Sequence, residues 1–100
     1  MAKTDKLLSN CTGFEWDEGN ITKNQDKHDV ANGECEQIFF NKPLILKKDK
    51  KYSTLENRYY VLGRTDFDRL IFAVFTIRGE KIRIISARDM TLSETERYCK

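Results

Sequence analysis

Hydrophobic and polar positions follow their most regular pattern in the second half of the chain. Three stretches there are rich in β-branched and aromatic residues, which favour strands: "RYYVLG" (58–63), "RLIFAVFTI" (69–77) and "KIRIISAR" (81–88). The turn-forming sequences "TDFD" and "RGE" separate them. The middle stretch is apolar at both odd and even positions, so it is predicted to be a central strand that is buried on both faces.

The first half predicts shorter elements. The sequence "GFEWD" (13–17) suits an edge strand, and Asp17 can cap a helix that runs to about His28. The sequence "NGECEQIFFN" (32–41) predicts a second helix, with Asn32 as its possible cap. The residues predicted to face the core from this helix are Cys35, Ile38 and Phe39.

The remaining elements follow from turn and capping residues. Pro43 is predicted to end the second helix, and "LIL" (44–46) to begin a strand. The highly charged sequence "KKDKKYSTLEN" (47–57) predicts a solvated loop or hairpin end. Thr91 is predicted to open a last helix, with Glu94 completing a capping box.

This order of elements predicts an α+β fold, with N-terminal helices packed on a small antiparallel sheet of three or four strands and a short C-terminal helix. The chain has 100 residues, a length that suits one domain with a single core. We expect residues 1–12 to be a flexible N-terminal segment and residues 13–100 to form the domain.

Composition excludes several classes of protein. No apolar stretch approaches the roughly 18 residues that a membrane span needs. The start, "MAKTDKLLSNCTG", lacks the apolar region of a secretory signal, so a cytoplasmic protein is expected. The three cysteines are odd in number and widely spaced, which indicates free thiols rather than disulfides or a zinc site.

The distribution of charge is more informative than the net charge of +2, because all seven arginines lie in the second half of the chain. The planar arginine side chain can bind phosphate through two hydrogen bonds at once. The alternative is that these arginines are ordinary surface residues neutralised by nearby acids. The candidate acids are Asp66, Asp68 and Asp89.

The positions of the arginines on the sheet depend on strand register. A tight turn at Gly79-Glu80 would place Arg78 opposite Lys81. Side chains alternate between the two faces of a strand, so the arginines are divided between the faces. One face is predicted to carry Arg78 and Arg83; the other, if Arg64 opposes Arg69, is predicted to carry Arg64, Arg69 and Arg88.

The reactive side chains available limit the possible chemistry. The chain has no phosphate-binding glycine motif and no paired metal-ligand motif, so neither a cofactor nor a metal is expected. It has one histidine, His28, directly after Lys27. Many cations with one histidine suit metal-free cleavage of RNA, in which a base removes the 2′-hydroxyl proton and cations stabilise the negative charge that develops. His28 can equally be a packing residue, since Ile21 and Asn24 share its helix face.

Several motifs in the same order resemble those of a known family. They are "FEWDEGN-x-x-KN-x-x-KH-x-V", "VLGRT", "RL-x-F-x-VFTIRG-x-x-IRIISAR" and "ERY", which together run from Phe14 to Tyr98. These motifs resemble the BrnT toxins of bacterial type II toxin–antitoxin pairs. The resemblance implies a RelE-like ribonuclease fold and RNA cleavage that stops translation. It also implies a BrnA-type antitoxin partner with a ribbon-helix-helix domain, through which alone the pair would bind DNA.

The resemblance also implies functional residues. Lys27 and His28 match the family's K-H pair, Arg64 its G-R-T arginine, Arg78 its F-T-x-R arginine and Arg88 the end of its I-S-A-R. The residues expected to be catalytic are His28, Arg64 and Arg88, and those expected to bind RNA are Lys27, Arg69, Arg78 and Arg83. Ala31 and Asn32 depart from the serine cap and aromatic residue common in the family. Trp16 and Asp17 match its W-D, for which structural roles are expected as core anchor and helix cap.

Three functions remain open at this point. The first is a metal-independent endoribonuclease toxin. The second is a non-catalytic module that binds RNA or protein through the same basic face. The third is a chain that has lost activity and remains only as the antitoxin's partner in a DNA-binding repressor complex.

Overall fold

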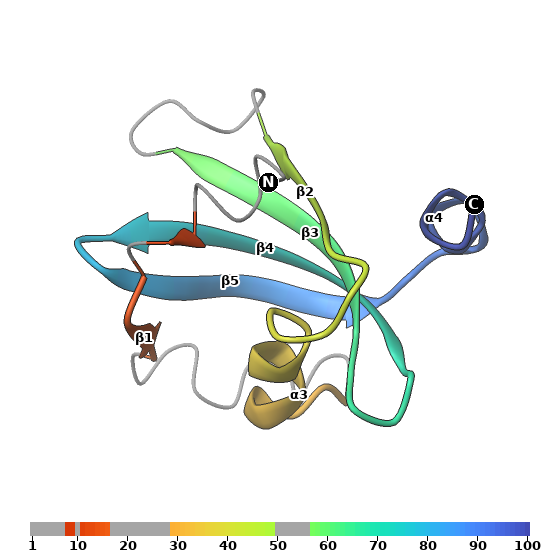
Figure 1. Ribbon diagram of the computed structural model, residues 1–100, viewed down its shortest axis with the longest axis horizontal. Helices are drawn as coiled ribbons and strands as arrows, with labels where there is room; N and C mark the ends of the chain where they lie inside the picture. Colours follow the sequence, from red (N-terminus) through yellow and green to blue (C-terminus); the bar gives the residue numbers. More distant parts are fainter. Residues whose placement is uncertain (1–7, 10, 17–28, 50–56) are drawn as a thin grey trace.

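The computed structural model describes residues 8–9, 11–16, 29–49 and 57–100. The elements with bounds in these residues are β1 (Gly13–Glu15), α3 (Asn32–Gln37), β2 (Ile45–Lys48), β3 (Arg58–Arg64), β4 (Leu70–Arg78), β5 (Lys81–Asp89) and α4 (Leu92–Tyr98) (Figure 1). The predicted helix from Asp17 to about His28 lies outside the described residues, as does most of the expected flexible segment 1–12.

The sheet differs from the predicted one. It has five strands in the order β1-β5-β4-β3-β2, and β1 pairs with β5 in parallel while the other pairs are antiparallel. The two helices with bounds are short, and one of them is C-terminal. The expected architecture, N-terminal helices on an antiparallel sheet of three or four strands, is therefore wrong. Residue alternation identifies strands but not their partners, so the pairing of β1 could not be read from its own sequence.

Other predictions about the elements are confirmed. β4 is the middle strand and β1 lies at an edge. Thr91 and Glu94 form the predicted capping box: Thr91 N donates to Glu94 Oε1 at 2.9 Å, and Glu94 N donates to Thr91 Oγ1 at 3.2 Å.

The cap of α3 was predicted wrongly, because Ala31 rather than Asn32 is the N-cap. Ala31 has no side-chain acceptor, and its own N–H is bound by Glu34 Oε1 at 3.1 Å.

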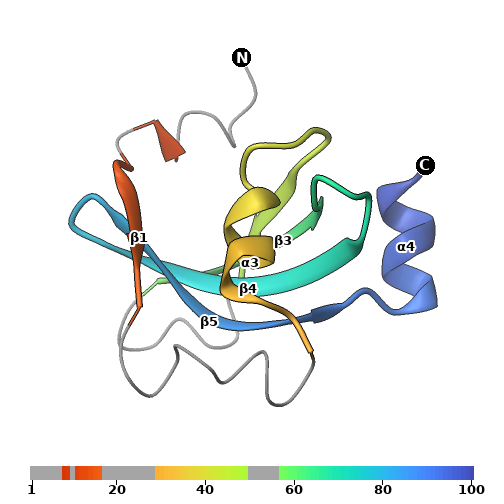
Figure 2. The ribbon, with the colours of Figure 1, turned by 90° about the horizontal axis from the view of Figure 1, so that it is seen from below.

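The hydrophobic core lies between α3 and one face of the sheet, which we call the core face. Cys35 and Ile38 are fully buried, as predicted, and the partly buried Phe39 packs edge-on to Phe75 with ring centroids 5.2 Å apart. The sheet residues of this cluster are Val61, Ile71, Ala73, Phe75, Ile82, Ile84 and Ala87. Figure 2 shows α3 beside the sheet and α4 at the end of the sheet far from β1. The opposite face of the sheet is therefore not covered by α3.

Two motif residues have structural roles. Gly63 permits close approach of α3, because a Cβ built there would lie 3.0 Å from the Ile38 Cβ and 3.2 Å from the Ile38 backbone oxygen. Trp16 packs against the core cluster and donates through Nε1 to Glu36 Oε2 at 2.9 Å. The role predicted for Trp16 is therefore confirmed, whereas Asp17 lies outside the described residues.

None of the described helices is long and apolar enough to cross a membrane.

Candidate nucleic-acid interface

The sheet face opposite α3, which we call the open face, combines cations with aromatic rings. Paired residues on neighbouring strands point to the same face, so the strand registers define its members. The basic and aromatic side chains on it are Lys47, Arg58, Tyr60, Arg64, Phe72, Arg78, Lys81, Arg83 and Arg88. Among the described strand residues, the acidic side chain on this face is Glu15, which pairs with Arg83. The face therefore carries a clear excess of positive charge.

A β-bulge places Arg88 on the open face. Arg78 opposes Lys81 as predicted, but the register shifts between Phe75, which pairs with Ile84, and Val74, which pairs with Ser86. The extra residue reverses the faces of all later β5 residues, and Arg88 comes to lie opposite Phe72. The prediction that Arg88 occupies the other face from Arg83 is therefore wrong.

The turn before β4 separates Arg64 from Arg69. Arg64 pairs with Leu70, one residue later than predicted, because Thr65 closes the loop by accepting the Arg69 N–H at its Oγ1 and donating its own N–H to the Arg69 oxygen. Arg64 therefore shares the open face with Arg88, while Arg69 points to the α3 side. The predicted cluster of three arginines on one face does not form.

Arg88 lies at one end of a row of stacked cations and rings. Its Cζ is 4.1 Å from the centre of the Phe72 ring. The Phe72 ring lies beside Tyr60 with centroids 5.6 Å apart, and Arg97 of α4 lies 5.9 Å from the centre of the Tyr60 ring. Such contacts between a guanidinium and a ring are attractive and hold the cation in a defined plane.

Glu94 fixes Arg88 from α4. Arg88 Nη1 donates to Glu94 Oε1 at 2.7 Å, and Arg88 Nη2 donates to Glu94 Oε2 at 3.0 Å. These hydrogen bonds raise the pKa of Arg88 and hold the pKa of Glu94 below its ordinary range. The sequence pattern predicts Glu94 only as a capping residue, and the bulge that brings Arg88 to it left no signal in the sequence.

Arg64 is held at the other end of α4. Its Nη1 donates to Asp68 Oδ1 at 2.6 Å, and its Nε donates to the Lys42 oxygen at 2.8 Å. The next backbone oxygen, that of Pro43, accepts from the Tyr98 hydroxyl at 2.6 Å. Because Glu94 and Tyr98 both belong to α4, this helix links the two candidate catalytic arginines.

Arg69 lies apart from the open face and is bound by acids on the α3 side. It forms ion pairs with Asp89 at 2.7 Å and with Glu34 at 3.1 Å. The hydrogen bond to Asp89 is the main cause that raises its pKa. Asp68 and Asp89 thus act as the neutralising acids that the sequence suggested, while Asp66 accepts from Asn41 Nδ2 at 3.0 Å.

The other candidate residues are placed as follows. Arg83 is about one-fifth exposed and lies 3.7 Å from Glu15, and Arg78 is exposed where β4 ends. Lys27 and His28 lie outside the described residues, so their positions relative to the arginines stay predictions.

Within the described part of the chain, no group of three or more His, Cys, Asp or Glu residues could hold a metal ion. Cys11, Cys35 and Cys99 are free thiols, as predicted, and burial raises the pKa of Cys35 to about 12.

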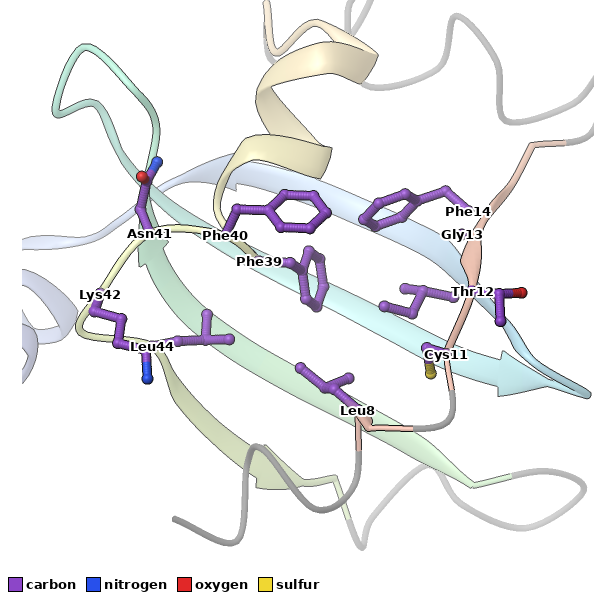
Figure 3. Close-up of a pocket in the computed structure, with 11 residues that line it drawn as sticks. Leu8, Cys11, Thr12, Gly13, Phe14, Phe39, Phe40, Asn41, Lys42 and Leu44 are labelled. Atoms are coloured by element: carbon purple, nitrogen blue, oxygen red, sulfur yellow. The ribbon is translucent and has the colours of Figure 1, made fainter. Parts of the chain in front are cut away.

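A separate apolar pocket lies on the α3 side of the sheet (Figure 3). Its volume is about 570 Å³, and Phe14, Phe39, Phe40 and Leu44 supply much of its wall. Phe14 pairs with Ile82, a core-face residue, so the pocket opens away from the arginines of the open face.

A sheet face that carries arginines beside aromatic rings is typical of proteins that act on nucleic acid, where cations contact phosphates and rings contact bases. Comparison with known families defines the class further. Residues 16–94 match the family described as ribonuclease toxin, BrnT, of type II toxin-antitoxin system. The chain therefore belongs to the BrnT family of ribonuclease toxins, whose members act on RNA and are paired with an antitoxin. The comparison with curated proteins gave no match.

Proposed function

We propose that this toxin is a metal-independent endoribonuclease that cuts RNA by attack of a 2′-hydroxyl and thereby inhibits translation. The observation that supports this most directly is the position of Arg88, held over the Phe72 ring on an open sheet face with excess positive charge. A cation fixed in this way can stabilise negative charge on a phosphate without rearrangement during the reaction, which is the usual source of large rate enhancements.

The reaction needs one base, one acid and cations. The base takes the proton of a 2′-hydroxyl, the 2′-oxygen forms a bond to the adjacent phosphorus, and the bond from phosphorus to the 5′-oxygen breaks. The leaving 5′-oxygen takes a proton from the acid. The products are a 2′,3′-cyclic phosphate and a 5′-hydroxyl, and no water enters the bond-breaking step.

We assign roles to the candidate residues within this reaction. His28 is the proposed base, and Arg64 and Arg88 are the proposed cations that stabilise the phosphorane-like transition state. Lys27, Arg78 and Arg83 are proposed to bind neighbouring phosphates. Arg69, which sequence analysis grouped with them, is bound by Asp89 and Glu34 on the other side of the sheet, and we now propose a structural role for it.

The antitoxin is proposed to cover the open face. Cations beside partly buried aromatic rings can accept both carboxylates and apolar side chains, so an antitoxin segment with acidic and apolar residues suits this surface. We propose that the antitoxin is of the BrnA type, with a ribbon-helix-helix domain that makes the contact with DNA. Loss of antitoxin binding when Arg78 and Arg83 are both replaced by alanine would support this surface; unchanged binding would place the interface elsewhere.

The central experiment is RNA cleavage by the purified protein in the presence of EDTA, followed by mapping of the product ends. We expect cyclic phosphate and 5′-hydroxyl ends, and loss of cleavage in His28→Ala, Arg64→Ala and Arg88→Ala. The melting temperature of each variant is measured beside its activity, because a packing residue would lower both. Ends that carry a 5′-phosphate, or cleavage abolished by EDTA, would contradict the mechanism. A folded and fully active His28→Ala variant would assign the histidine to packing.

A non-catalytic binding module is the second candidate. It is favoured by the ion pairs that already occupy Arg64 and Arg83 with Asp68 and Glu15. Such a module, or an inactive toxin kept as the antitoxin's partner in a repressor complex, would bind RNA or antitoxin but leave RNA uncut in the same assay.

A further inference from the structure

Arg88 has one edge of its guanidinium without an acceptor among the described residues. A guanidinium has two edges that can each bind a pair of oxygens: one is formed by Nη1 and Nη2, the other by Nε and Nη2. In Arg88 the first edge is occupied by Glu94, and the remaining hydrogen of Nη1 points to the Asp89 backbone oxygen at 3.1 Å. No acceptor for the Nε–H or the second Nη2–H lies among the residues that the structure describes. The edge formed by these two groups has the geometry that binds two oxygens of a phosphate.

Arg69 shows the opposite arrangement on the other side of the sheet. Its Nε and Nη2 donate to the two carboxylate oxygens of Asp89 at 2.7 Å and 3.1 Å. Its Nη1 donates to the Asp29 backbone oxygen at 2.8 Å and to Glu34 Oε1 at 3.1 Å. All three nitrogens of the Arg69 guanidinium therefore donate within the protein, whereas the Arg88 bonds to described residues come from Nη1 and Nη2 alone.

We infer that Glu94 is a positioning residue, which holds Arg88 by its Nη1–Nη2 edge so that the Nε–Nη2 edge faces a phosphate of bound RNA. This inference rests on the proposed function. Phe72 fixes the plane of the guanidinium at 4.1 Å, and Glu94 fixes its rotation within that plane. The carboxylate is the more buried partner, since the Glu94 side chain is 15% exposed and that of Arg88 is 35% exposed. The pair thus turns its cationic side toward solvent.

Glu94 is itself held in place. One of its oxygens, Oε1, accepts both from Arg88 Nη1 and from the Thr91 backbone N–H at 2.9 Å. Because Thr91 is the N-cap of α4, the start of this helix and the orientation of Arg88 are fixed by the same carboxylate. A cation oriented before RNA binds loses little conformational freedom on binding, so the cost of ordering it does not reduce the rate.

The test compares Glu94→Gln with Glu96→Gln. Both changes remove one negative charge from α4, but Glu96 is exposed, and the hydrogen bonds of Arg88 to described residues go to Glu94 and Asp89. Glutamine can replace glutamate in a capping box, so α4 should keep its start in Glu94→Gln. We expect kcat for RNA cleavage to fall about 10-fold to 100-fold in Glu94→Gln, with little change in KM, because a misplaced cation stabilises the transition state poorly. Glu96→Gln should keep the kcat of the wild type.

The opposite result has a distinct meaning. If Glu94 instead competed with RNA for Arg88, Glu94→Gln would cleave as fast as Glu96→Gln or faster, and the inference would be overturned. A double-mutant cycle tests whether Glu94 acts through Arg88. In an Arg88→Lys background, Glu94→Gln should change kcat by less than about twofold. An equal loss in both backgrounds would show that Glu94 acts independently of Arg88 and would overturn the inference.

A binding measurement separates this inference from the proposed function. The arginine Nε–H signal of Arg88 is identified in an ¹⁵N NMR spectrum by its absence in Arg88→Lys, and 2′-O-methyl RNA, which cannot be cleaved by this route, is added. We expect the Arg88 Nε–H signal to move. If backbone signals of the open face move while that signal does not, RNA binds but the assigned edge is wrong. If no signal moves and no RNA is cut, both proposals fail.

Discussion

Arg69 and Asp89 form a two-point ion pair on the α3 side of the sheet, with Arg69 Nε 2.7 Å from Asp89 Oδ1 and Arg69 Nη2 3.1 Å from Asp89 Oδ2. Asp89 directly follows Arg88, and consecutive strand residues point to opposite faces. The end of β5 therefore carries a structural contact on one side and the candidate phosphate-binding arginine on the other. Glu34 joins the structural contact from α3, so the ion pairs of Arg69 tie this helix to the sheet.

Replacing Arg69 by alanine should reduce stability rather than activity. The change leaves Asp89 and Glu34 without their cation, and hydrogen bonds to charged groups are worth about 1.5–3 kcal/mol each. We expect the free energy of unfolding, measured with urea, to fall by about 1–3 kcal/mol, with kcat retained below the unfolding transition. Arg78→Ala is the control on the exposed end of β4, and it should alter stability by less than about 0.5 kcal/mol. Loss of activity in Arg69→Ala at unchanged stability would contradict the structural role.

Residue patterns predicted the strands better than their registers. The three long strands, the central place of β4, the tight turn after Arg78 and the capping box of α4 all follow from local residue types, which act over a few positions. The faces of Arg88 and Arg64 depend on one extra residue in β5 and on a one-residue difference in the loop after Thr65. A single residue reverses every later side chain in a strand. These two differences leave Arg64 and Arg88 on one shared face, but they move both arginines to the face of Arg78 and Arg83 and leave Arg69 on the other.

The partners of the site were less predictable than its arginines. Glu94 contacts Arg88 only because α4 turns back toward the sheet, and its capping pattern carried no sign of this second contact. Arg88 was expected on the other face from Arg83, and the bulge brought it opposite Phe72. The parallel pairing of β1 joins residues far apart in sequence, such as Phe14 and Ile82. Contacts of this kind depend on the whole fold, and a single sequence does not specify them.

Gly63 should be intolerant of a side chain. A Cβ at this position would lie 3.0 Å from the Ile38 Cβ, 3.1 Å from Leu44 Cδ1 and 3.2 Å from the Ile38 backbone oxygen. The backbone of α3's last turn cannot move without disturbing the buried core, so Gly63→Ala should destabilise the protein by about 1–3 kcal/mol in urea unfolding. Unchanged stability would show that the atoms around Gly63 can move apart to make room for a methyl group at little energetic cost.

Gly33 provides the matched control for the same substitution. It lies in α3, and a Cβ built there would meet no atom of the described residues outside its own helix turn within 4 Å. Alanine is a better helix former than glycine by about 0.8–1.0 kcal/mol, so Gly33→Ala should raise stability by up to this amount. The two Gly→Ala variants should therefore change the free energy of unfolding in opposite directions.

RNA affinity should depend on salt through the arginines of the open face. Each phosphate contact on a single strand contributes about −0.7 to the slope of log K against log salt concentration. We expect Arg83→Ala and Arg88→Ala each to reduce this slope by about 0.7 for 2′-O-methyl RNA, measured by fluorescence anisotropy at several salt concentrations. Arg69→Ala, with its charge already bound on the opposite side of the sheet, should leave the slope nearly unchanged. Equal effects of all three variants would show only a general dependence on net charge.

The ion pair between Arg88 and Glu94 should also make stability depend on pH. The hydrogen bonds from Arg88 hold the pKa of Glu94 in the folded protein below the ordinary value of 4.5. The unfolded chain therefore takes up a proton at this group before the folded protein does. The resulting stabilisation is fully present above about pH 4.5 and is lost as the pH falls through the lower, folded-state pKa.

Urea unfolding of the wild type and Glu94→Gln between about pH 7 and about pH 3 measures this contribution. Glutamine carries no ionisable group, so the stability advantage of the wild type over Glu94→Gln should be constant at neutral pH and shrink as the solution becomes more acidic than about pH 4.5. The wild type and Glu96→Gln should both keep the acid-dependent loss that Glu94→Gln lacks. An advantage over Glu94→Gln that stays constant down to the lowest pH would mean that Glu94 gains nothing from its charge in the folded protein, and that its contact with Arg88 is not the ion pair described here.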